Sequence, residues 1–211
     1  MTCGTGAQVF WLAEHGYTVT GVDFSPDLLV IAREKAQYSK HDIRFVDGDV
    51  RTVTVDSGTL VDAVITIGNA VGHMTKHGFG KALRNIHRHV RDGGLYVFDI
   101  CNAEAMTDAV VAGFSQYHKI DVDDTQLHVV QCSTFDATTG CLTSVDHCIM
   151  QTLGGPPRTR VSRFSLQLYG ASELQHMLRA HGFEVITCCS TDGTPYVAHR
   201  TTSLFVVAKK Q

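Results

Sequence analysis

The sequence predicts an α/β fold with a mostly parallel sheet, helices on both faces of that sheet, and an antiparallel β insertion. Residues 1–114 alternate between helical and strand patterns, which is typical of a parallel sheet covered by helices. From about residue 115 the period changes, and four strand-like segments follow one another as in an antiparallel meander. We therefore expect a core over 1–114, an antiparallel insertion over 115–170, and a C-terminal part over 171–211 that completes the core.

The first half opens with a helix over 7–15 and an alternating, β-branched strand over 17–23. A second helix is predicted from Ser25-Pro26-Asp27 to about Tyr38, because a serine can cap a helix, proline suits its first position, and an acid favours its N-terminal end. A continuous apolar strand over 63–67 is predicted to be buried on both faces. The other elements expected here are strands over 43–46 and 95–100 and helices over 79–90 and 103–112.

The second half reads as strands separated by turns. Asp, Gly and Pro residues mark the breaks between strands over 117–123, 127–135, 142–151 and 161–169. Ser172 is then expected to cap a helix that ends at Gly182. Two final strands are predicted over 183–189 and 203–209.

Composition narrows the class of protein. Of 211 residues, 44% are hydrophobic and 18% are charged, which is typical of a globular domain. The net charge of −3 and the lack of an evident lysine or arginine cluster argue against a nucleic-acid partner. No run of about 18 apolar residues and no signal-peptide pattern is present, so we expect a cytoplasmic protein without a membrane partner.

Cysteines and histidines do not indicate a metal site. The seven cysteines include no C-x-x-C pair, which favours reduced and partly buried thiols. The twelve histidines are scattered, and His87 and His89, the closest pair, point to different sides of a helix. No metal is expected.

Three features that could bind a ligand lie at the ends of predicted elements in the first half. Cys3-Gly4-Thr5-Gly6 stands directly before a helix, where glycines allow close backbone approach and the helix start favours negative groups, although a tight turn would look the same. Asp23 ends the next strand, about twenty residues on, where a carboxylate can accept hydrogen bonds from both hydroxyls of an adenosine ribose. Asp49 follows the strand predicted over 43–46 and can accept a hydrogen bond from an adenine amino group. Taken singly, Asp23 could be a solvated acid at a strand end, and Asp49 could be an ordinary turn aspartate.

Two further segments could contact a substrate. The stretch from Ile67 to His73 contains two glycines, and Asn69 and His73 would offer polar groups at the crevice, although His73 could equally be a helix-capping histidine. Arg163, Gln167 and Tyr169 alternate along one predicted strand and would share a face that could bind a carboxylate, an amide or a ring. That face could instead be solvated or form a dimer surface.

As an ordered set these motifs resemble those of class I S-adenosylmethionine-dependent methyltransferases, whose fold is Rossmann-like. The set also includes Val90-Arg91-Asp92-Gly93-Gly94-Leu95 and the final strand over 203–209. The resemblance implies S-adenosylmethionine as cofactor, with the glycine loop at its methionine end, Asp23 at the ribose, Asp49 at the adenine and Asn69 near the sulfonium. The cofactor-binding residues implied are Cys3, Gly4, Thr5, Gly6, Asp23, Phe24, Asp49, Val50, Ile67, Gly68 and Asn69.

The stretch from Ile67 to His73, together with the antiparallel insertion, resembles the branch of the family that contains glycine and sarcosine N-methyltransferases and aminosugar N,N-dimethyltransferases. This resemblance implies methyl transfer to a small molecule, most naturally an amine nitrogen, with S-adenosylhomocysteine as the second product. His73 is the candidate to accept the amine proton, and the candidate substrate residues are Asn69, His73, Arg163, Gln167 and Tyr169. A homodimer is compatible with the insertion.

Two other functions remain open. A nicotinamide-dependent oxidoreductase is disfavoured because Val9 stands where the third small residue of G-x-G-x-x-G belongs, and no Y-x-x-x-K pair is present. A non-catalytic or truncated binding protein is the stronger alternative. The family has a strand ending in an acid before the glycine loop and a first glycine where Thr2 stands, and this chain shows neither. We therefore expect a sheet that lacks its usual first strand, and activity that depends on what fills the slot.

Overall fold

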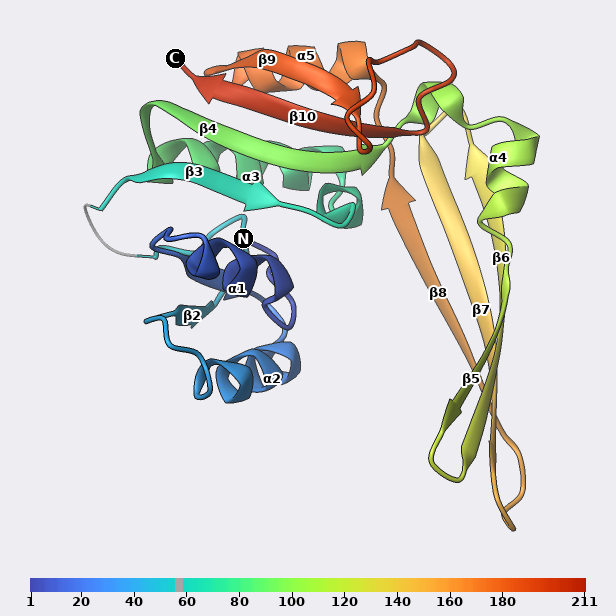
Figure 1. Ribbon diagram of the computed structural model, residues 1–211. Helices are drawn as coiled ribbons and strands as arrows, with labels where there is room; N and C mark the ends of the chain where they lie inside the picture. The colour runs from blue at the N-terminus through green and yellow to red at the C-terminus, as the bar shows by residue number, and fades with distance from the viewer. Residues whose placement is uncertain (56–58) are drawn as a thin grey trace.

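The computed structural model describes residues 1–55 and 59–211, and within them the chain forms three β-sheets (Figure 1). The strands, in the order of the sheets, are β1 (Thr20–Asp23) and β2 (Arg44–Asp47); β3 (Val61–Thr66), β4 (Val90–Cys101), β10 (Ser203–Lys210) and β9 (Phe183–Ser190); and β5 (Tyr117–Val122), β6 (Thr125–Asp136), β7 (Cys141–Thr152) and β8 (Arg158–Gln167). The helices are α1 (Ala7–Glu14), α2 (Pro26–Ala36), η1 (Ala70–His73), α3 (Lys76–His89), η2 (Ala103–Ala105), α4 (Asp108–Gly113) and α5 (Ala171–Ala180).

The fold class is confirmed as Rossmann-like α/β with an additional antiparallel sheet. β1 pairs in parallel with β2, and β3 pairs in parallel with β4, whereas β10 runs antiparallel to both β4 and β9. β5 to β8 pair in sequence order as an antiparallel meander. No helix among the described residues is both long and apolar enough to span a membrane.

The main core lies between α3, α5 and one face of the four-stranded sheet. Phe79, Leu83 and Ile86 recur at helical spacing on α3 and are fully buried against Tyr96 and Phe98 of β4. Full burial of each such side chain contributes roughly 1.5–3 kcal/mol. This layer fixes the position of β3 and β4, whose ends carry part of the site.

The opposite face of the same sheet is only partly covered, which corrects the prediction that the strand over 63–67 is buried on both faces. An apolar cavity of about 410 Å³ lies between Trp11 and Leu12 of α1 and the side chains of Ile65, Ile67 and Val97. Ile65 and Ile67 are therefore half-buried, whereas Val64 packs into the main core.

A slot separates the β1–β2 sheet from the four-stranded sheet. Among the described residues no strand pairs β1 with β3. The first residues of the chain bridge one end of the slot, because the Cys3 amide donates to the Val22 carbonyl at 2.9 Å and the Met1 amine donates to the Ile65 carbonyl at 2.7 Å. Figure 1 shows the N-terminus between α1 and β3.

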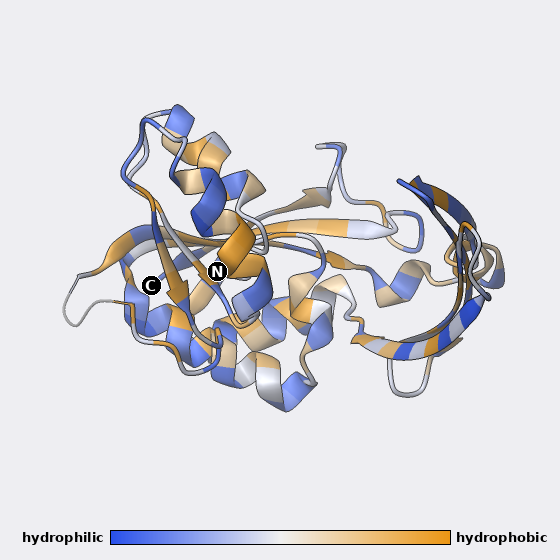
Figure 2. Cartoon of the chain, turned by 90° about the horizontal axis from the view of Figure 1, so that it is seen from below, coloured by the Kyte–Doolittle hydropathy of each residue, from blue (hydrophilic) through white to orange (hydrophobic). Residues whose placement is uncertain are grey.

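The β5–β8 sheet projects from the core, as Figure 1 shows. Its strands are striped in orange and blue in Figure 2, because successive residues point to opposite faces. Leu142 and Leu166 at its inner end pack with Cys101 and Leu168, and Val111 of α4 lies against them. This small second core holds the sheet to the end of β4.

Three local predictions were wrong. Gly170, not Ser172, precedes α5 as its N-cap. The single helix expected over 103–112 is two elements, because the side chains of Asn102 and Thr107 each cap a separate helical start. The strand expected from Tyr17 begins only at Thr20.

Candidate functional site

The glycine loop turns sharply between the slot and α1. Gly4 and Gly6 have φ of +54° and +88°, the left-handed region that favours glycine. A Cβ added to Gly4 would meet nothing within 4 Å, so the space over this residue is open. A Cβ added to Gly6 would lie 2.8 Å from a ring carbon of Phe10 and 3.1 Å from one of Phe45. Gly6 therefore allows aromatic packing under the loop, and Gly4 leaves room above it.

Thr2 occupies the position where the resembling family has a glycine. Its φ is +59°, a backbone conformation that costs a non-glycine residue roughly 1–2 kcal/mol. A glycine would adopt this conformation without that cost. The start of α1 has no side-chain cap, so its first amides are available to a ligand.

Asp23, at the end of β1, is buried beside this loop with only 6% of its surface exposed. One carboxylate oxygen accepts the Gly4 amide at 2.7 Å, and the other accepts the Ser25 amide at 3.0 Å. A carboxylate offers about four acceptor positions, so each oxygen can still accept one more hydrogen bond. The arrangement fits two adjacent hydroxyl donors, as the ribose prediction requires.

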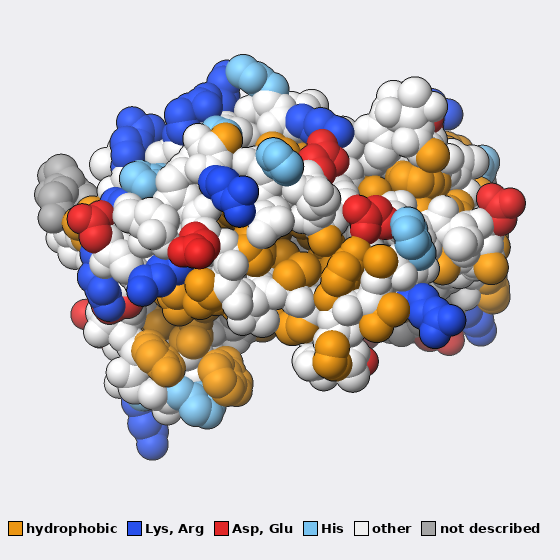
Figure 3. All heavy atoms as spheres, turned by 90° about the horizontal axis from the view of Figure 1, so that it is seen from above, with side chains coloured by type: hydrophobic (Ala, Val, Ile, Leu, Met, Phe, Trp, Pro, Cys, Tyr) orange, Lys and Arg blue, Asp and Glu red, His pale blue; other side chains and the backbone are white. Residues whose placement is uncertain are grey.

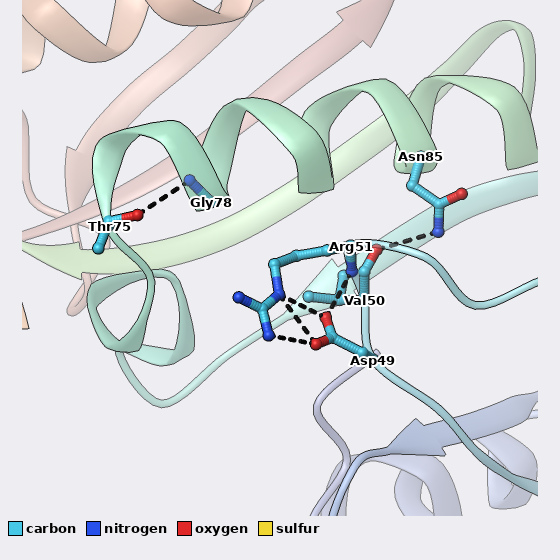
Figure 4. A network of polar contacts seen from close by, with 6 residues as sticks. All are labelled: Asp49, Val50, Arg51, Thr75, Gly78 and Asn85. Carbon is cyan, nitrogen blue, oxygen red and sulfur yellow. Dashed lines mark hydrogen bonds and ion pairs between the residues drawn. The ribbon is translucent and has the colours of Figure 1, made fainter.

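Asp49 follows β2, whose last residue, Asp47, pairs in register with Asp23. Its carboxylate is not open, because Arg51 holds it with Nε at 2.9 Å from both oxygens and with Nη2 on the second oxygen (Figure 4). The Arg51 amide also donates to it, at 2.8 Å. These hydrogen bonds from the Arg51 side chain are the main reason that the pKa of Asp49 lies below its usual value. An adenine amino group would therefore share this carboxylate with Arg51.

The loop that carries Asp49 is fastened to α3. The buried amide of Asn85 donates to the Val50 carbonyl at 3.0 Å (Figure 4) and to the Val53 carbonyl at 2.9 Å. Val50 is itself 7% exposed and belongs to the main core. Asn85 is a positioning residue that the sequence analysis did not identify, since a polar residue on the buried face of a helix was the only signal.

Hydrogen bonds made by Asn69 fix the turn after β3. Gly68 and Asn69 have φ of +87° and +57°, and asparagine is one of the few side chains that tolerate this region. The Asn69 amide donates to Asp99 at 2.9 Å, and its side-chain oxygen accepts the Cys101 amide at 3.0 Å. A Cβ at Gly68 would meet nothing within 4 Å. Asp99 was not identified from the sequence, because it lies inside a predicted strand.

The remaining predicted cofactor and catalytic residues differ in exposure. Phe24 is 72% exposed and Ile67 is half-buried. Burial raises the pKa of the Cys3 thiol to about 11, and the nearby Asp23 carboxylate adds to this effect. His73 is exposed at the end of η1, and no contact made by its ring within the described part of the chain identifies it as a cap.

Of the three substrate candidates on the insertion, Arg163 and Gln167 share one face of β8, whereas Tyr169 does not belong to this strand. Arg163 is exposed on β8. The Gln167 side chain donates to the Thr139 carbonyl at 2.9 Å and so fastens the turn between β6 and β7. Tyr169 lies beyond the end of β8, fully buried against Phe79. Its hydroxyl is one of two buried side-chain atoms in the described regions without a hydrogen-bond partner.

The glycine loop lies beside Asp23, because the Gly4 amide donates to that carboxylate, and the Met1 amine connects the start of the chain to Ile65 of β3, shortly before the Gly68–Asn69 turn. Asp49 lies one strand further on, bound to Arg51. Among residues 1–55 and 59–211, no group of three metal-ligating side chains is close enough to hold an ion.

The family model and the relatives that match this chain are all methyltransferases. A family model described as methyltransferase domain matches residues 1–94. Glycine N-methyltransferase from Oryctolagus cuniculus is 30% identical over 209 residues, covering 85% of this chain and 66% of the relative. A glycine/sarcosine N-methyltransferase from Aphanothece halophytica is 32% identical over 116 residues, covering 54% of this chain and 43% of the relative. The chain therefore spans less than two thirds of the length of these relatives.

Solved structures share the fold at lower identity. A methyltransferase from Clostridium acetobutylicum superposes with a TM-score of 0.79 at 15% identity, covering 99% of this chain and 81% of that one. An amino pentose methyltransferase from Micromonospora echinaspora, solved with S-adenosylmethionine bound, gives a TM-score of 0.76 at 22% identity, covering 100% and 81%. At these identities the likeness concerns the fold alone.

Proposed function

The chain belongs to the family of class I S-adenosylmethionine-dependent methyltransferases, and from this premise we propose that it binds S-adenosylmethionine and methylates a small molecule. The observation that carries the proposal is Asp23, a buried carboxylate with one free acceptor position on each oxygen, beside open space over Gly4. The two ribose hydroxyls of the cofactor are donors of the right kind and spacing for it.

The other cofactor contacts follow from the same edge of the sheets. The glycine loop and the uncapped start of α1 would receive the methionine end, and Phe24 would lie beside the ribose. The amide of Val50 and the carboxylate of Asp49 would meet the adenine, with Arg51 retaining part of the carboxylate. Gly68 and Asn69 would border the sulfonium end, where the open space over Gly68 admits a ligand.

The acceptor that we propose is an amine nitrogen. The support is that the relatives and one solved neighbour named above are N-methyltransferases of glycine and sarcosine or a methyltransferase of an amino sugar. When bound, the cofactor would supply a methyl group on a positively charged sulfur for transfer to a nitrogen lone pair, leaving S-adenosylhomocysteine. The protein's own contribution is to position the amine and exclude water.

His73 would hold the amine proton. Its imidazole is exposed at the end of η1, close in sequence to the Asn69 turn, and imidazole is the side chain that takes up and releases protons near neutral pH. The Asn69 side-chain oxygen is already bound to the Cys101 amide, which leaves its NH₂ group to orient the substrate.

Tyr169 is the best supported of the three substrate candidates on the insertion. A buried hydroxyl without a partner is costly and is expected where a ligand or water supplies one. We predict that Tyr169→Phe leaves the melting temperature unchanged or higher and raises the KM for the amine severalfold. A loss of stability with unchanged KM would assign the hydroxyl a purely structural role.

The proposal is tested by mass spectrometry of products after incubation with S-adenosylmethionine and a panel of amines, amino acids, aminosugars and carboxylic acids. We expect a mass increase of one or more methyl groups on an amine, with release of S-adenosylhomocysteine. Calorimetric titrations with S-adenosylmethionine and with NADH accompany it. A folded, monodisperse protein that binds neither would instead be a non-catalytic relative, and binding of NADH alone would make it an oxidoreductase.

A further inference from the structure

A second cavity, of about 450 Å³, lies on the solvent side of α3. All six residues that line it carry a cationic or imidazole side chain: Arg51, Lys81, Arg84, His87, Arg88 and His181. No carboxylate is among them. No lysine or arginine cluster is evident in the sequence, but the folded chain forms one at this cavity.

The fold assembles this cluster from three segments. Lys81, Arg84 and Arg88 follow one another at helical spacing on α3, over about 10 Å of helix at 1.5 Å per residue. Asn85 fastens the Val50–Val53 segment to α3, which places Arg51 at the same wall.

His181 joins the cluster from the end of α5. Its ring approaches α3 at Gly80, where an added Cβ would lie 3.4 Å from the ring nitrogen Nε2. The glycine thus leaves just enough room for the imidazole to stand beside the helix. The His181 ring thus lines one side of the cavity.

Within residues 1–55 and 59–211, few carboxylates pair with the charges in the cavity. Arg51 has a carboxylate partner, Asp49. Arg84 lies 3.4 Å from a ring nitrogen of His181, and Arg88 donates to the neutral oxygen of Asn85 at 3.2 Å. Neighbouring like charges repel one another unless a counterion is bound, so the cluster is more favourable with an anion in the cavity than without one.

We propose that this cavity binds a small anion that carries a diphosphate group. An arginine guanidinium group can donate two parallel hydrogen bonds to a pair of phosphate oxygens. A row of cationic side chains about 10 Å long can bind two adjoining phosphate groups rather than one. The volume is that of a small-ligand site, not of an extended nucleic-acid surface. Figure 3 shows lysine, arginine and histidine side chains gathered on the side of the molecule where α3 lies.

The site is separate from the one proposed for methyl transfer. Lys81, Arg84 and Arg88 are exposed, whereas the opposite side of α3 packs into the main core. Only Arg51 belongs to both regions, through its contact with Asp49. The inference therefore does not depend on the proposed activity, and its test is performed without S-adenosylmethionine.

The test is isothermal titration of the full chain with pyrophosphate, with ADP and with inorganic phosphate, in magnesium-free buffer at low ionic strength. The variant is Lys81→Ala/Arg84→Ala. The matched control is Arg158→Ala/Arg160→Ala, which removes the same charge from exposed positions on β8. Thermal melting confirms that each variant is folded.

We expect pyrophosphate to bind the wild type with a Kd below about 1 mM and at least tenfold more tightly than phosphate. The Lys81→Ala/Arg84→Ala variant should lose at least tenfold in affinity, and the control less than twofold. ADP binding as tightly as pyrophosphate would identify the diphosphate alone as the ligand group, and tighter ADP binding that the Lys81→Ala/Arg84→Ala variant loses would identify a nucleotide. Equal losses in both variants, or no saturable binding by a folded wild type, would overturn the proposal.

Discussion

Asp23 and Asp49 stand at the ends of adjacent strands, yet their surroundings differ. Asp23 is buried and accepts two backbone amides, whereas Asp49 is partly exposed and paired with a side chain of its own loop. The sequence predicted both positions from their order after strands. It could not predict the pairing with Arg51, because a contact between residues two apart depends on the turn that the loop adopts.

The pair gives a prediction about protonation. Arg51 holds the pKa of Asp49 below its usual value, so Arg51→Ala should raise that pKa, as measured by carboxyl-carbon NMR titration. A carboxyl with a lowered native pKa stabilises the fold above its unfolded pKa, and that contribution disappears as the pH falls through the native pKa. Stability should therefore depend less on pH in the acid range in the variant. Arg91→Ala, which breaks the separate pair with Asp62, should leave the pKa of Asp49 unchanged; an equal shift would refute the assignment.

At the scale of elements, the slot between β1 and β3 is the unusual feature. β3 bonds to β4 along one edge, and along the other edge the described contact is the Met1 amine on Ile65. β4 is bonded on both edges, to β3 and β10. Half of the backbone groups of β3 and β1 thus point into the slot.

Amide hydrogen exchange followed by NMR tests this arrangement. We expect alternate amides of β3 to exchange at least about tenfold faster than central amides of β4, because they lack a partner strand. Central amides of β10, which is also bonded on both edges, serve as the control. Equal protection of every amide in β3 would show that another segment or molecule occupies the slot.

The elements that were predicted well are those with strong local signals. The helix after Ser25 was predicted from its cap and proline, and the Ser25 hydroxyl does accept the Leu28 amide. The long α3 was predicted from its apolar spacing. The region over 103–112 was predicted less well, since two caps five residues apart divide it and the choice between one helix and two rests on tertiary packing.

At the scale of the whole molecule, the projecting β5–β8 sheet has an apolar row on one face. Tyr117 of β5, Val130 of β6 and Val161 of β8 lie in register, with the exposed His147 of β7 between Val130 and Val161, and 60%, 43% and 61% of the three apolar surfaces are exposed. We predict a homodimer through this face, because exposed apolar side chains gathered on one face mark an interaction site.

Light scattering after size-exclusion chromatography should give twice the mass of one chain. Val130→Lys should shift it toward a single chain, because a charge would be buried in the interface. Val197→Lys, at an exposed valine outside the sheet, is the matched control and should remain dimeric. A wild type that is monomeric at high concentration would contradict the prediction.

The basic cavity is a feature that short sequence patterns could not predict. Its walls come from segments around residues 51, 81–88 and 181, which no short window of sequence brings together. The order of the family motifs, by contrast, is carried by the chain itself, and so cofactor-binding residues could be proposed from the sequence, whereas the basic cavity could not.

The most direct test of the central claim is calorimetric titration of S-adenosylmethionine into Asp23→Ala and into Asp47→Ala, its exposed register partner on β2. Thermal melting would first establish that both variants fold. Loss of Asp23 should weaken binding at least tenfold, or about 1.4 kcal/mol, whereas loss of Asp47 should change it less than twofold. Unchanged affinity in Asp23→Ala would show that the ribose lies elsewhere and would remove the basis of the methyltransferase site described above.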